Sequence, residues 1–518
     1  MPMTVSPFRT EPLTDFAQPA GRQAMEQAIR GVGAELGREF PLLIDGREVR
    51  SGATFRSINP SQADQTVAVV QQGTGDHVEQ AVQAALRAYE SWQRVPAEER
   101  CALLLRAAAI LRHRRLRAAA WMSFEVGKNW TEADADVAEA LDFLEYYARE
   151  SLRYAHGPAL PPLAGEMSEY QYIPLGVVAV ISPWNFPLAI PTGMTIGAIA
   201  SGNTVVMKPA SDSVATAYQV VDALREAGLP PGVLNVIPGS GGVVGEALAS
   251  HPKVRMIAFT GSKEVGTHLF ERAAKTPPGQ IWLKRIIAEM GGKNAIIVDD
   301  EADLDAATAG VIASAYGYQG QKCSAGSRVV ATPRAYGRLT EMIVERARAL
   351  EIGPGPENFP AGPVINAAAE RKILEYVEVG RREGRLATGG GRARDGGFYV
   401  APTVFVDVAP DARIAQEEIF GPVVAAIPAR DFDDALRIAN GTAFGLTGSV
   451  YTLNPEKLAK ARREFMCGNL YLNRKSTGAM VGTHPFGGFN MSGTDSKAGG
   501  PDYLLNFLQP KVVAYRYI

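Results

Sequence analysis

Hydrophobic residues in the amino-terminal part of the chain repeat every three or four positions, which is the spacing of one buried helix face. One such stripe comprises Val78, Val82, Ala85, Leu86 and Tyr89. Asp76 and Glu79 stand at its start with the spacing of an N-terminal capping box, so we expect a helix to begin there. A second stripe, within residues 98–115, comprises Cys101, Leu104, Ala108 and Leu111. Residues 1–37, ahead of these helices, predict a helical arm.

The pattern changes after Gly176. Short apolar runs without alternation occupy residues 177–181, 204–207, 233–237 and 255–259, and Pro, Gly or Ser soon follows each run. Strands that are buried on both faces have this pattern, and their alternation with helical stretches predicts a doubly wound parallel sheet. Ligands of such sheets bind beyond the carboxyl ends of the strands. We therefore expect the chemistry in the loops that follow these four runs.

A second α/β block extends from Glu289 to about Gly478. Its strand candidates are residues 295–298, 327–331, 400–405 and 448–450. No linker rich in Pro, Gly or Ser separates the two blocks, so we expect them to pack as one rigid body. Residues 168–173 and 511–518 alternate like antiparallel strands. Exposed edge strands of this kind often pair with another subunit.

The 518-residue composition is that of an ordinary globular protein, with 46% hydrophobic and 21% charged residues. A net charge of −2 gives no electrostatic reason to expect nucleic acid or an anionic membrane as a partner. Three cysteines exclude a disulfide framework and are typical of a reducing compartment. The amino terminus has no secretory pattern, and no apolar stretch reaches the ~20 residues that span a bilayer. We therefore expect a cytoplasmic protein.

Cys323 lies in the polar loop AYGYQGQKCSAGS, between a helical stretch and a strand. A free cysteine is most often a small buried hydrophobe, and Cys101 and Cys467 fit that interpretation. Cys323 differs, because its neighbours are polar and no apolar periodicity surrounds it. A nucleophilic thiolate needs an accessible, electropositive setting that lowers its pKa below about 8.5, and a polar loop can supply one.

Two more side chains are candidates for the same chemistry. Glu289, in AEMGGKN, is either a solvated loop carboxylate or a base that activates water for thioester hydrolysis. Asn185, in SPWNFP, is either part of a turn or an amide donor to an oxyanion. None of the six histidines lies in a recognisable dyad motif, and neither HExxH nor CxxC occurs. A Cys-His hydrolase and a metal site are therefore disfavoured.

A phosphate site is expected where FTGSKEVG (259–266) follows a strand and opens a helix. Backbone N–H groups at a helix N-terminus bind phosphate, and glycine allows close approach. The segment lacks the GxGxxG fingerprint, and a bare GxxxxG is weak support. Lys208, after the second apolar run, is a cation at a strand end that is well placed for a ribose or a phosphate.

Seven motifs occur in the order and at the spacing of the aldehyde dehydrogenase superfamily, which the chain resembles from about residue 40 onward. They are PWNFP, MKPA, FTGSKEVG, EMGGKN, GQKC, EEIFGP and PFGGF. The resemblance implies an α/β fold of two doubly wound, Rossmann-like domains with a small antiparallel oligomerisation flap. The implied domains are an NAD(P)-binding domain (38–158 and 174–288), a catalytic domain (289–478) and the flap (159–173 and 500–518).

The resemblance also implies a role for each candidate residue. Cys323 would be the nucleophile, Glu289 the general base, and Asn185, with the backbone N–H of Cys323, the oxyanion hole. Lys208 and Glu418 would hold the two riboses of the cofactor. The full set of implied cofactor-binding residues is Ser182, Pro183, Trp184, Lys208, Ser211, Gly261, Ser262, Val265, Glu418 and Phe420.

Ser211 departs from the family pattern, which usually has a glutamate here that binds the adenine ribose and disfavours a 2′-phosphate. We therefore expect NAD as the main cofactor, with NADP also accepted.

The amino-terminal arm and residues 124–149 and 473–504 resemble the 1-pyrroline-5-carboxylate dehydrogenases within the superfamily. This implies L-glutamate 5-semialdehyde, from ring opening of 1-pyrroline-5-carboxylate, as substrate and glutamate as product, the second step of proline breakdown. Ser324 and the backbone N–H groups of Gly478 and Ala479 would bind the substrate α-carboxylate. Phe186 and Phe486 would flank its aliphatic chain. A tight loop is the alternative interpretation of Gly478 and Ala479.

Two other functions stay open as alternatives. One is another semialdehyde dehydrogenase, for example for succinate semialdehyde, against which the loop near Gly478 argues. The other is a catalytically silent binding protein, against which the joint presence of Cys323, Glu289 and Asn185 argues. The terminal strands and the resemblance predict a homodimer or a higher homo-oligomer, and a proline dehydrogenase is a candidate partner.

Overall fold

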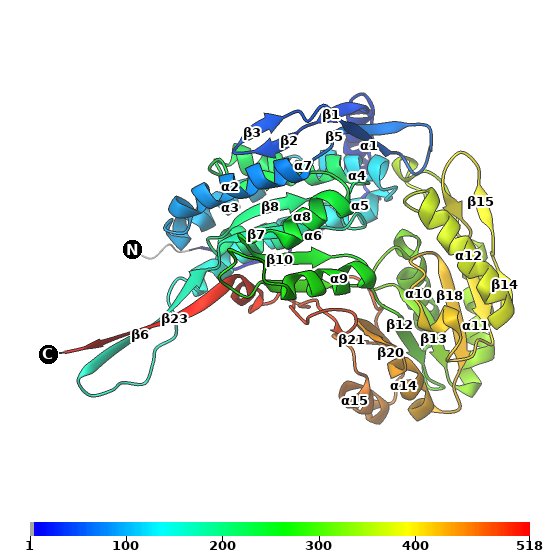
Figure 1. Ribbon diagram of the computed structural model, residues 1–518. Coiled ribbons are helices and arrows are strands. Elements are labelled where there is room, and N and C mark those ends of the chain that lie inside the picture. The colour runs from blue at the N-terminus through cyan, green and yellow to red at the C-terminus, as the bar shows by residue number, and fades with distance from the viewer. Residues whose placement is uncertain (1–4, 518) are drawn as a thin grey trace.

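The computed structural model describes residues 5–517, so the expectations for residues 1–4 and 518 lie outside the described residues. Two seven-stranded sheets, each covered by helices on both faces, form the body of the protein (Figure 1). This confirms the α/β fold with two doubly wound sheets.

The first sheet has the strand order β11-β10-β7-β8-β9-β2-β3. Strands β7 to β11 run parallel, and β2 and β3 add an antiparallel hairpin at one edge. All four apolar runs predicted in this block are strands, because small and β-branched side chains bury both faces. The bounds are β2 (Leu42–Ile44), β3 (Arg47–Val49), β7 (Val177–Ile181), β8 (Thr204–Lys208), β9 (Leu234–Val236), β10 (Val254–Thr260) and β11 (Arg285–Glu289).

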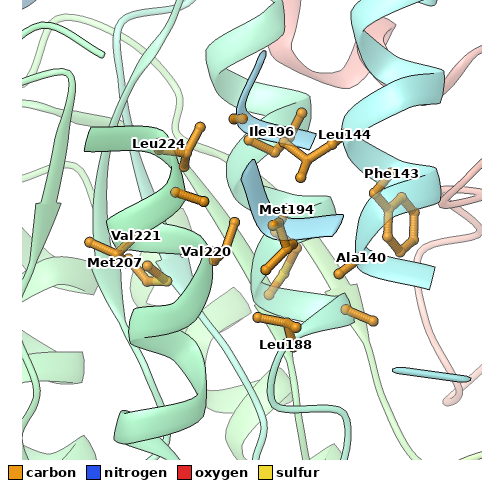
Figure 2. Close-up of a cluster of buried hydrophobic side chains, with 14 of the residues drawn as sticks. Ala140, Phe143, Leu144, Leu188, Met194, Ile196, Met207, Val220, Val221 and Leu224 are labelled. Carbon is orange, nitrogen blue, oxygen red and sulfur yellow. The ribbon is translucent and has the colours of Figure 1, made fainter. Parts of the chain in front are cut away.

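Helices α2, α8 and α9 cover one face of this sheet, while α1 and α3 to α7 belong to the core on the other face. Figure 2 shows side chains of α5, α6, α7 and β8 packed into one buried cluster on that second face. The helices are α1 (Pro19–Gly33), α2 (Gly75–Trp92), α3 (Ala97–His113), α4 (Arg115–Glu125), α5 (Trp130–Arg153), α6 (Ala189–Ala200), α7 (Val214–Glu226), α8 (Glu246–Ser250) and α9 (Lys263–Ala274).

Two local predictions in this half are wrong. Residues 5–18 of the predicted helical arm are not helical, because Pro7 and Pro12 interrupt any helix there. This segment instead runs along α5, whose Asp134 and Asp142 accept its backbone N–H groups. Helix α2 begins at Gly75, with Thr74 and His77 forming the capping box, so Asp76 and Glu79 already lie inside the helix.

The second sheet has the strand order β14-β17-β18-β13-β12-β20-β21, all parallel except for β14 at one edge. The predicted strand at 400–405 is divided, because Pro402 has no N–H to donate to a ladder. Strands β14 and β18 are additions that were not predicted. The bounds are β12 (Asn294–Val298), β13 (Gly326–Ala331), β14 (Arg385–Thr388), β17 (Thr403–Val406), β18 (Val423–Pro428), β20 (Thr447–Tyr451) and β21 (Asn469–Leu472).

Helices α10 and α11 pack on one face of the second sheet, and α12, α14 and α15 pack on the other. The helices are α10 (Leu304–Tyr316), α11 (Pro333–Arg348), α12 (Ala367–Glu383), α13 (Arg413–Gln416), α14 (Phe432–Asn440) and α15 (Pro455–Glu464). Smaller pairings involve β1 (Arg38–Phe40), β4 (Thr54–Ile58), β5 (Thr66–Gln71), β15 (Arg392–Arg394), β16 (Tyr399–Val400), β19 (Phe444–Gly445) and β22 (Phe489–Asn490).

A long two-stranded ribbon projects from the body of the protein (Figure 1). It pairs β6 (Glu166–Pro174) with β23 (Leu508–Arg516) in antiparallel register along both strands. The two alternating segments are therefore strands, as predicted, and within one chain they pair with each other. Apolar side chains such as Val512 and Tyr515 remain more than half exposed on this ribbon.

Candidate active site

A cavity lies where the carboxyl ends of β10 and β11 meet the loops of the second block. Thr260 and Glu289 reach it from these strand ends, while Cys323 reaches it from the loop before β13. The cavity brings together most of the residues predicted for catalysis and substrate binding. Those that line it are Phe186, Glu289, Cys323, Ser324, Gly478, Ala479 and Phe486.

Cys323 is partly exposed, whereas the other two cysteines are buried. The loop before it turns sharply at Tyr318 and Gln319, both with positive φ. Burial raises the pKa of the Cys323 thiol to about 12, and the carboxylates of Glu418 and Glu289 act in the same direction. These carboxylates contrast with the electropositive setting that the polar loop led us to expect.

Glu289, the last residue of β11, is only 8% exposed. Its carboxylate accepts hydrogen bonds from the Ser496 hydroxyl (2.7 Å), the Ser496 N–H (3.4 Å) and the Gly488 N–H (3.2 Å). Burial raises the pKa of this carboxyl to about 7, although these donors oppose the rise. A carboxyl with such a pKa is half ionised near neutral pH, which suits a general base.

Asn185 is buried beside the loop that carries Cys323, although it is not among the residues that line the cavity. Its side-chain N–H donates to the Gln321 carbonyl at 3.1 Å, two residues before the cysteine. This bond orients the amide, and a second N–H of the same amide stays available for an oxyanion.

The residues predicted for the cofactor lie at the carboxyl ends of the first sheet. Ser182, Pro183 and Trp184 follow β7, Lys208 ends β8, and Ser211 stands three positions further on. The Lys208 ammonium is buried and donates to the neighbouring Pro209 carbonyl at 3.1 Å. Burial lowers the pKa of Lys208 to about 8.

The β10–α9 turn has the geometry expected of a phosphate site. Gly261 follows β10, and Ser262 is the N-cap of α9, with its hydroxyl accepting from the Val265 N–H at 3.3 Å. Ser262 and Val265 are exposed. The first backbone N–H groups of α9 therefore face solvent, where an anionic group can reach them.

Glu418 and Phe420 approach this region from the second block. The Glu418 carboxylate accepts from the Gly292 N–H at 2.9 Å. The ring of Phe420 stands edge-on to Trp184, with 5.5 Å between the ring centroids. The loop that carries Glu418 and Phe420 thus contacts two segments far away in the sequence, one at Gly292 and one at Trp184.

The loop after β21 closes the cavity on its far side. Gly478 has a φ of +79°, a conformation that favours glycine, and it stands beside Ala479 at the cavity wall. Phe486 is held by paired backbone hydrogen bonds to Ala498 at 2.7 and 2.8 Å. Ser324 lines the cavity next to Cys323.

The geometry agrees with the comparison to known proteins. A model of the aldehyde dehydrogenase family matches residues 48–513. The chain belongs to the aldehyde dehydrogenase family.

Three known proteins show how similar this aldehyde dehydrogenase is to its relatives. The chain is 53% identical over 511 residues to a 1-pyrroline-5-carboxylate dehydrogenase of Geobacillus thermodenitrificans, covering 98% of this chain and 99% of that protein. A crystal structure of 1-pyrroline-5-carboxylate dehydrogenase from Thermus with bound NAD is 51% identical, with a TM-score of 0.99 over 99% of this chain and 100% of the other. Proline utilization A from Bdellovibrio bacteriovorus is 46% identical, with a TM-score of 0.97 over all of this chain and 54% of the longer one.

The aldehyde dehydrogenase cavity also contains residues that the motifs did not reveal. Glu139 of α5 lines it, and burial together with the Asp136 carboxylate raises the pKa of Glu139 to about 8. Behind Phe186, the fully buried Lys128 ammonium lies 2.6 Å from Asp136 and 4.1 Å from the centre of the Phe186 ring. Their spacing could have revealed Asp136 and Glu139, because two acidic residues three positions apart lie on the same face of a helix, and this helix is largely buried.

Among residues 5–517 of this aldehyde dehydrogenase, no helix is both long and apolar enough to cross a membrane. Over the same residues, no three or more His, Cys, Asp or Glu side chains are grouped so as to hold a metal ion.

Proposed function

We propose that the chain oxidises L-glutamate 5-semialdehyde, formed by ring opening of 1-pyrroline-5-carboxylate, to L-glutamate with NAD, as the second step of proline breakdown. The observation that carries this proposal is one cavity that contains a thiol, a buried carboxylate and a loop of small residues, in a chain similar over its full length to 1-pyrroline-5-carboxylate dehydrogenases.

Cys323 is the proposed nucleophile, whose sulfur adds to the aldehyde carbon. The Asn185 amide and the Cys323 backbone N–H donate to the oxygen on which charge develops, an effect worth about 3–4 kcal/mol in comparable sites. Loss of a hydride from the carbon of this adduct to the cofactor would leave a thioester on Cys323. Glu289 then takes a proton from water, which hydrolyses the thioester and releases the acid. The carboxylate form of Glu289 is required, so this step gains rate as the pH rises through about 7.

The residues at the first sheet fit a dinucleotide. The Ser182 hydroxyl is buried and has no hydrogen-bond partner within residues 5–517, and the buried Lys208 ammonium has N–H groups left for a ligand beyond its bond to Pro209. Lys208 and Glu418 would hold the riboses, and the α9 N-terminus at Ser262 would hold a phosphate. When bound, NAD supplies a positive charge beside the thiol, which favours the thiolate, and an acceptor for the hydride.

Substrate selection is assigned to the other side of the cavity. Ser324 and the N–H groups of Gly478 and Ala479 would hold the α-carboxylate, because a nest of small residues exposes backbone donors to an anion. Phe186 and Phe486 would flank the methylene groups. Succinate semialdehyde is the competing substrate, and it has no α-amino group.

The discriminating assay follows the absorbance of the reduced cofactor with 1-pyrroline-5-carboxylate, succinate semialdehyde and a simple aldehyde. We expect the highest kcat/KM with 1-pyrroline-5-carboxylate. Preference for succinate semialdehyde would overturn the substrate, and no signal with any of them would favour the silent binding protein. Cys323→Ala is expected to fold and bind NAD without turnover, and appreciable turnover would remove its role.

The domain and partner assignments are part of the same proposal. The NAD-binding domain comprises residues 38–158 and 174–288, the catalytic domain 289–478, and the flap 159–173 and 500–518. The β6–β23 ribbon supports assembly into a homodimer or higher homo-oligomer, because its exposed apolar side chains stand away from the body. Similarity to part of the longer proline utilization A chain supports a proline dehydrogenase as partner, and we place the protein in the cytoplasm.

A further inference from the structure

Asn294, the first residue of β12, makes three hydrogen bonds around the loop that carries Cys323. Its side-chain N–H groups donate to the Cys323 carbonyl at 2.7 Å and to the Ala325 carbonyl at 2.8 Å. Its side-chain oxygen accepts from the Thr447 N–H at 2.9 Å, which ties the amide to the neighbouring strand β20. With only 2% of Asn294 exposed, water does not compete for these bonds.

The bond to the Cys323 carbonyl acts on the sulfur through one peptide group. The Cys323 carbonyl and the Ser324 N–H belong to the same planar unit, so fixing one end fixes the other. The Ser324 N–H, which is next to the Cys323 sulfur in the chain, opposes the rise in the thiol pKa. A carbonyl that accepts a hydrogen bond also makes the N–H of its peptide a better donor.

The surrounding backbone leaves little room for another arrangement of this peptide. A Cβ atom at Gly292 would lie 2.5 Å from the Cys323 carbonyl oxygen and 2.7 Å from the Asn294 side-chain oxygen. The next carbonyl, that of Ser324, accepts from the hydroxyls of Thr447 (3.3 Å) and Ser476 (3.1 Å). Both carbonyls that flank the Ser324 N–H are therefore anchored.

We propose that Asn294 is a positioning residue for the Cys323 thiolate: by holding the carbonyls of Cys323 and Ala325, it fixes the Cys323–Ser324 peptide beside the sulfur, where the peptide N–H favours the thiolate. This inference rests on the proposed role of Cys323 as nucleophile. The charged groups that face the sulfur are carboxylates, Glu289 from β11, Glu418 from the loop before β18 and, further off, Glu139 from α5, and all of them oppose the thiolate. The Ser324 N–H is the group that acts in the opposite direction.

The test is the rate at which iodoacetamide alkylates Cys323 in the full-length protein without substrate, measured by peptide mass spectrometry from pH 7 to pH 9. At a pH below the thiol pKa, the rate is proportional to the thiolate fraction. We expect Asn294→Ala to lower it about tenfold, which corresponds to a rise of about one unit in the thiol pKa. Asn294→Ser keeps a hydroxyl donor, so its rate of Cys323 alkylation is expected to lie between those of the unchanged protein and Asn294→Ala. It replaces Asn294→Ala in the test if that variant does not fold.

Asn235 of β9 is a matched control, because it is fully buried and has the same set of bonds. Its amide donates to the Gly232 and Val205 carbonyls and accepts from the Asp45 N–H, away from the thiol. Asn235→Ala is expected to leave the Cys323 rate unchanged. The buried Cys101 and Cys467 report loosening of the fold, since their alkylation would then accelerate.

An Asn294 variant that folds and is alkylated at Cys323 as fast as the unchanged protein would overturn the inference. Equal slowing in Asn235→Ala would overturn it too, because the effect would then be a general consequence of lost stability. Failure of the proposed function gives a different result: protein fully alkylated at Cys323 would still oxidise the semialdehyde, whatever the rates of alkylation.

Discussion

Glu289→Gln is expected to separate acylation from hydrolysis. The substitution keeps the shape of the side chain and removes its ability to take a proton from water. General-base catalysis accelerates a reaction by about a hundredfold to ten-thousandfold, so we expect the steady-state rate to decrease by a factor in that range. Formation of the thioester does not need this carboxylate in the proposed mechanism. The first turnover is therefore expected to continue, and acylated enzyme to accumulate.

The same substitution has a second, pH-dependent effect on stability. The pKa of Glu289 rises from 4.5 to about 7 on folding, so the folded protein holds this proton more tightly than the unfolded chain. Ionisation therefore costs about 3 kcal/mol of stability above pH 7, and this cost disappears below about pH 4.5. A glutamine cannot accept all the hydrogen bonds that Glu289 accepts from Ser496 and Gly488. One lost bond costs about 1 kcal/mol, which leaves Glu289→Gln about 2 kcal/mol more stable at pH 8.

Stopped-flow absorbance of the reduced cofactor measures the kinetic part of this prediction, and intact-protein mass spectrometry detects the acylated Cys323. We expect a burst close to the enzyme concentration, followed by slow turnover. Urea unfolding at pH 5 and pH 8 measures the stability part. Turnover at the normal rate, or slow turnover without a burst, would refute the assignment of Glu289 as the base.

Glu125 provides the matched control for this experiment. It is buried on α4, where it accepts from the Thr216 hydroxyl and two backbone N–H groups of α7, and burial raises its pKa to about 7. Glu125→Gln is expected to change the pH dependence of stability in the same way as Glu289→Gln, but to show no burst of reduced cofactor. A burst in this variant would show that the kinetic effect does not depend on the position of the carboxylate.

Ser211→Glu is expected to raise the preference for NAD over NADP, because a carboxylate repels a 2′-phosphate. If kcat/KM of the unchanged protein is already more than about a thousandfold higher with NAD than with NADP, or about 4 kcal/mol, the expectation that NADP is also accepted is contradicted. Lys128→Met leaves Asp136 buried without its partner, so we expect about 3–5 kcal/mol of lost stability and a lower kcat, while Lys275→Met at an exposed pair changes the melting temperature little. Equal melting temperatures for the two variants would be the contrary result. Val512→Glu places a charge on the exposed ribbon, where the side chain is 59% exposed, and is expected to shift light scattering toward the monomer. An unchanged protein that is already monomeric at micromolar concentration would contradict the proposed dimer.

Much of the framework could be predicted because buried parallel strands have a direct signature in the chain. The runs at 177–181 and 255–259 are apolar on both faces, and both are central strands of the first sheet. Strand β14 has no such signature, since it lies at an edge of the second sheet and none of its residues is fully buried. The strand predicted at 400–405 is interrupted at Pro402, because proline has no N–H group for the hydrogen bonds between strands. A search for apolar runs does not take these hydrogen bonds into account.

The motifs predicted which residues form the site, but they did not predict the burial and the charges that surround these residues. Cys323 and Glu289 stand in short segments with their own signals, and the cavity brings them together. Burial, and after it the carboxylate of Glu418 from a distant part of the chain, raises the pKa of the Cys323 thiol, whereas the polar neighbours of the cysteine led us to expect a lowered pKa. Lys128 and Asn294 act through contacts across the fold, and such contacts have no local pattern in the sequence.

The short connector between β11 and β12 joins the two sheets and separates Glu289 from Asn294 by only Met290, Gly291, Gly292 and Lys293. The proposed water-activating group and the amide that anchors the cysteine loop thus stand at the two ends of one short connector. Both groups are held by the same few residues of backbone, so a substitution that displaced this connector would move the proposed base and the anchoring amide together.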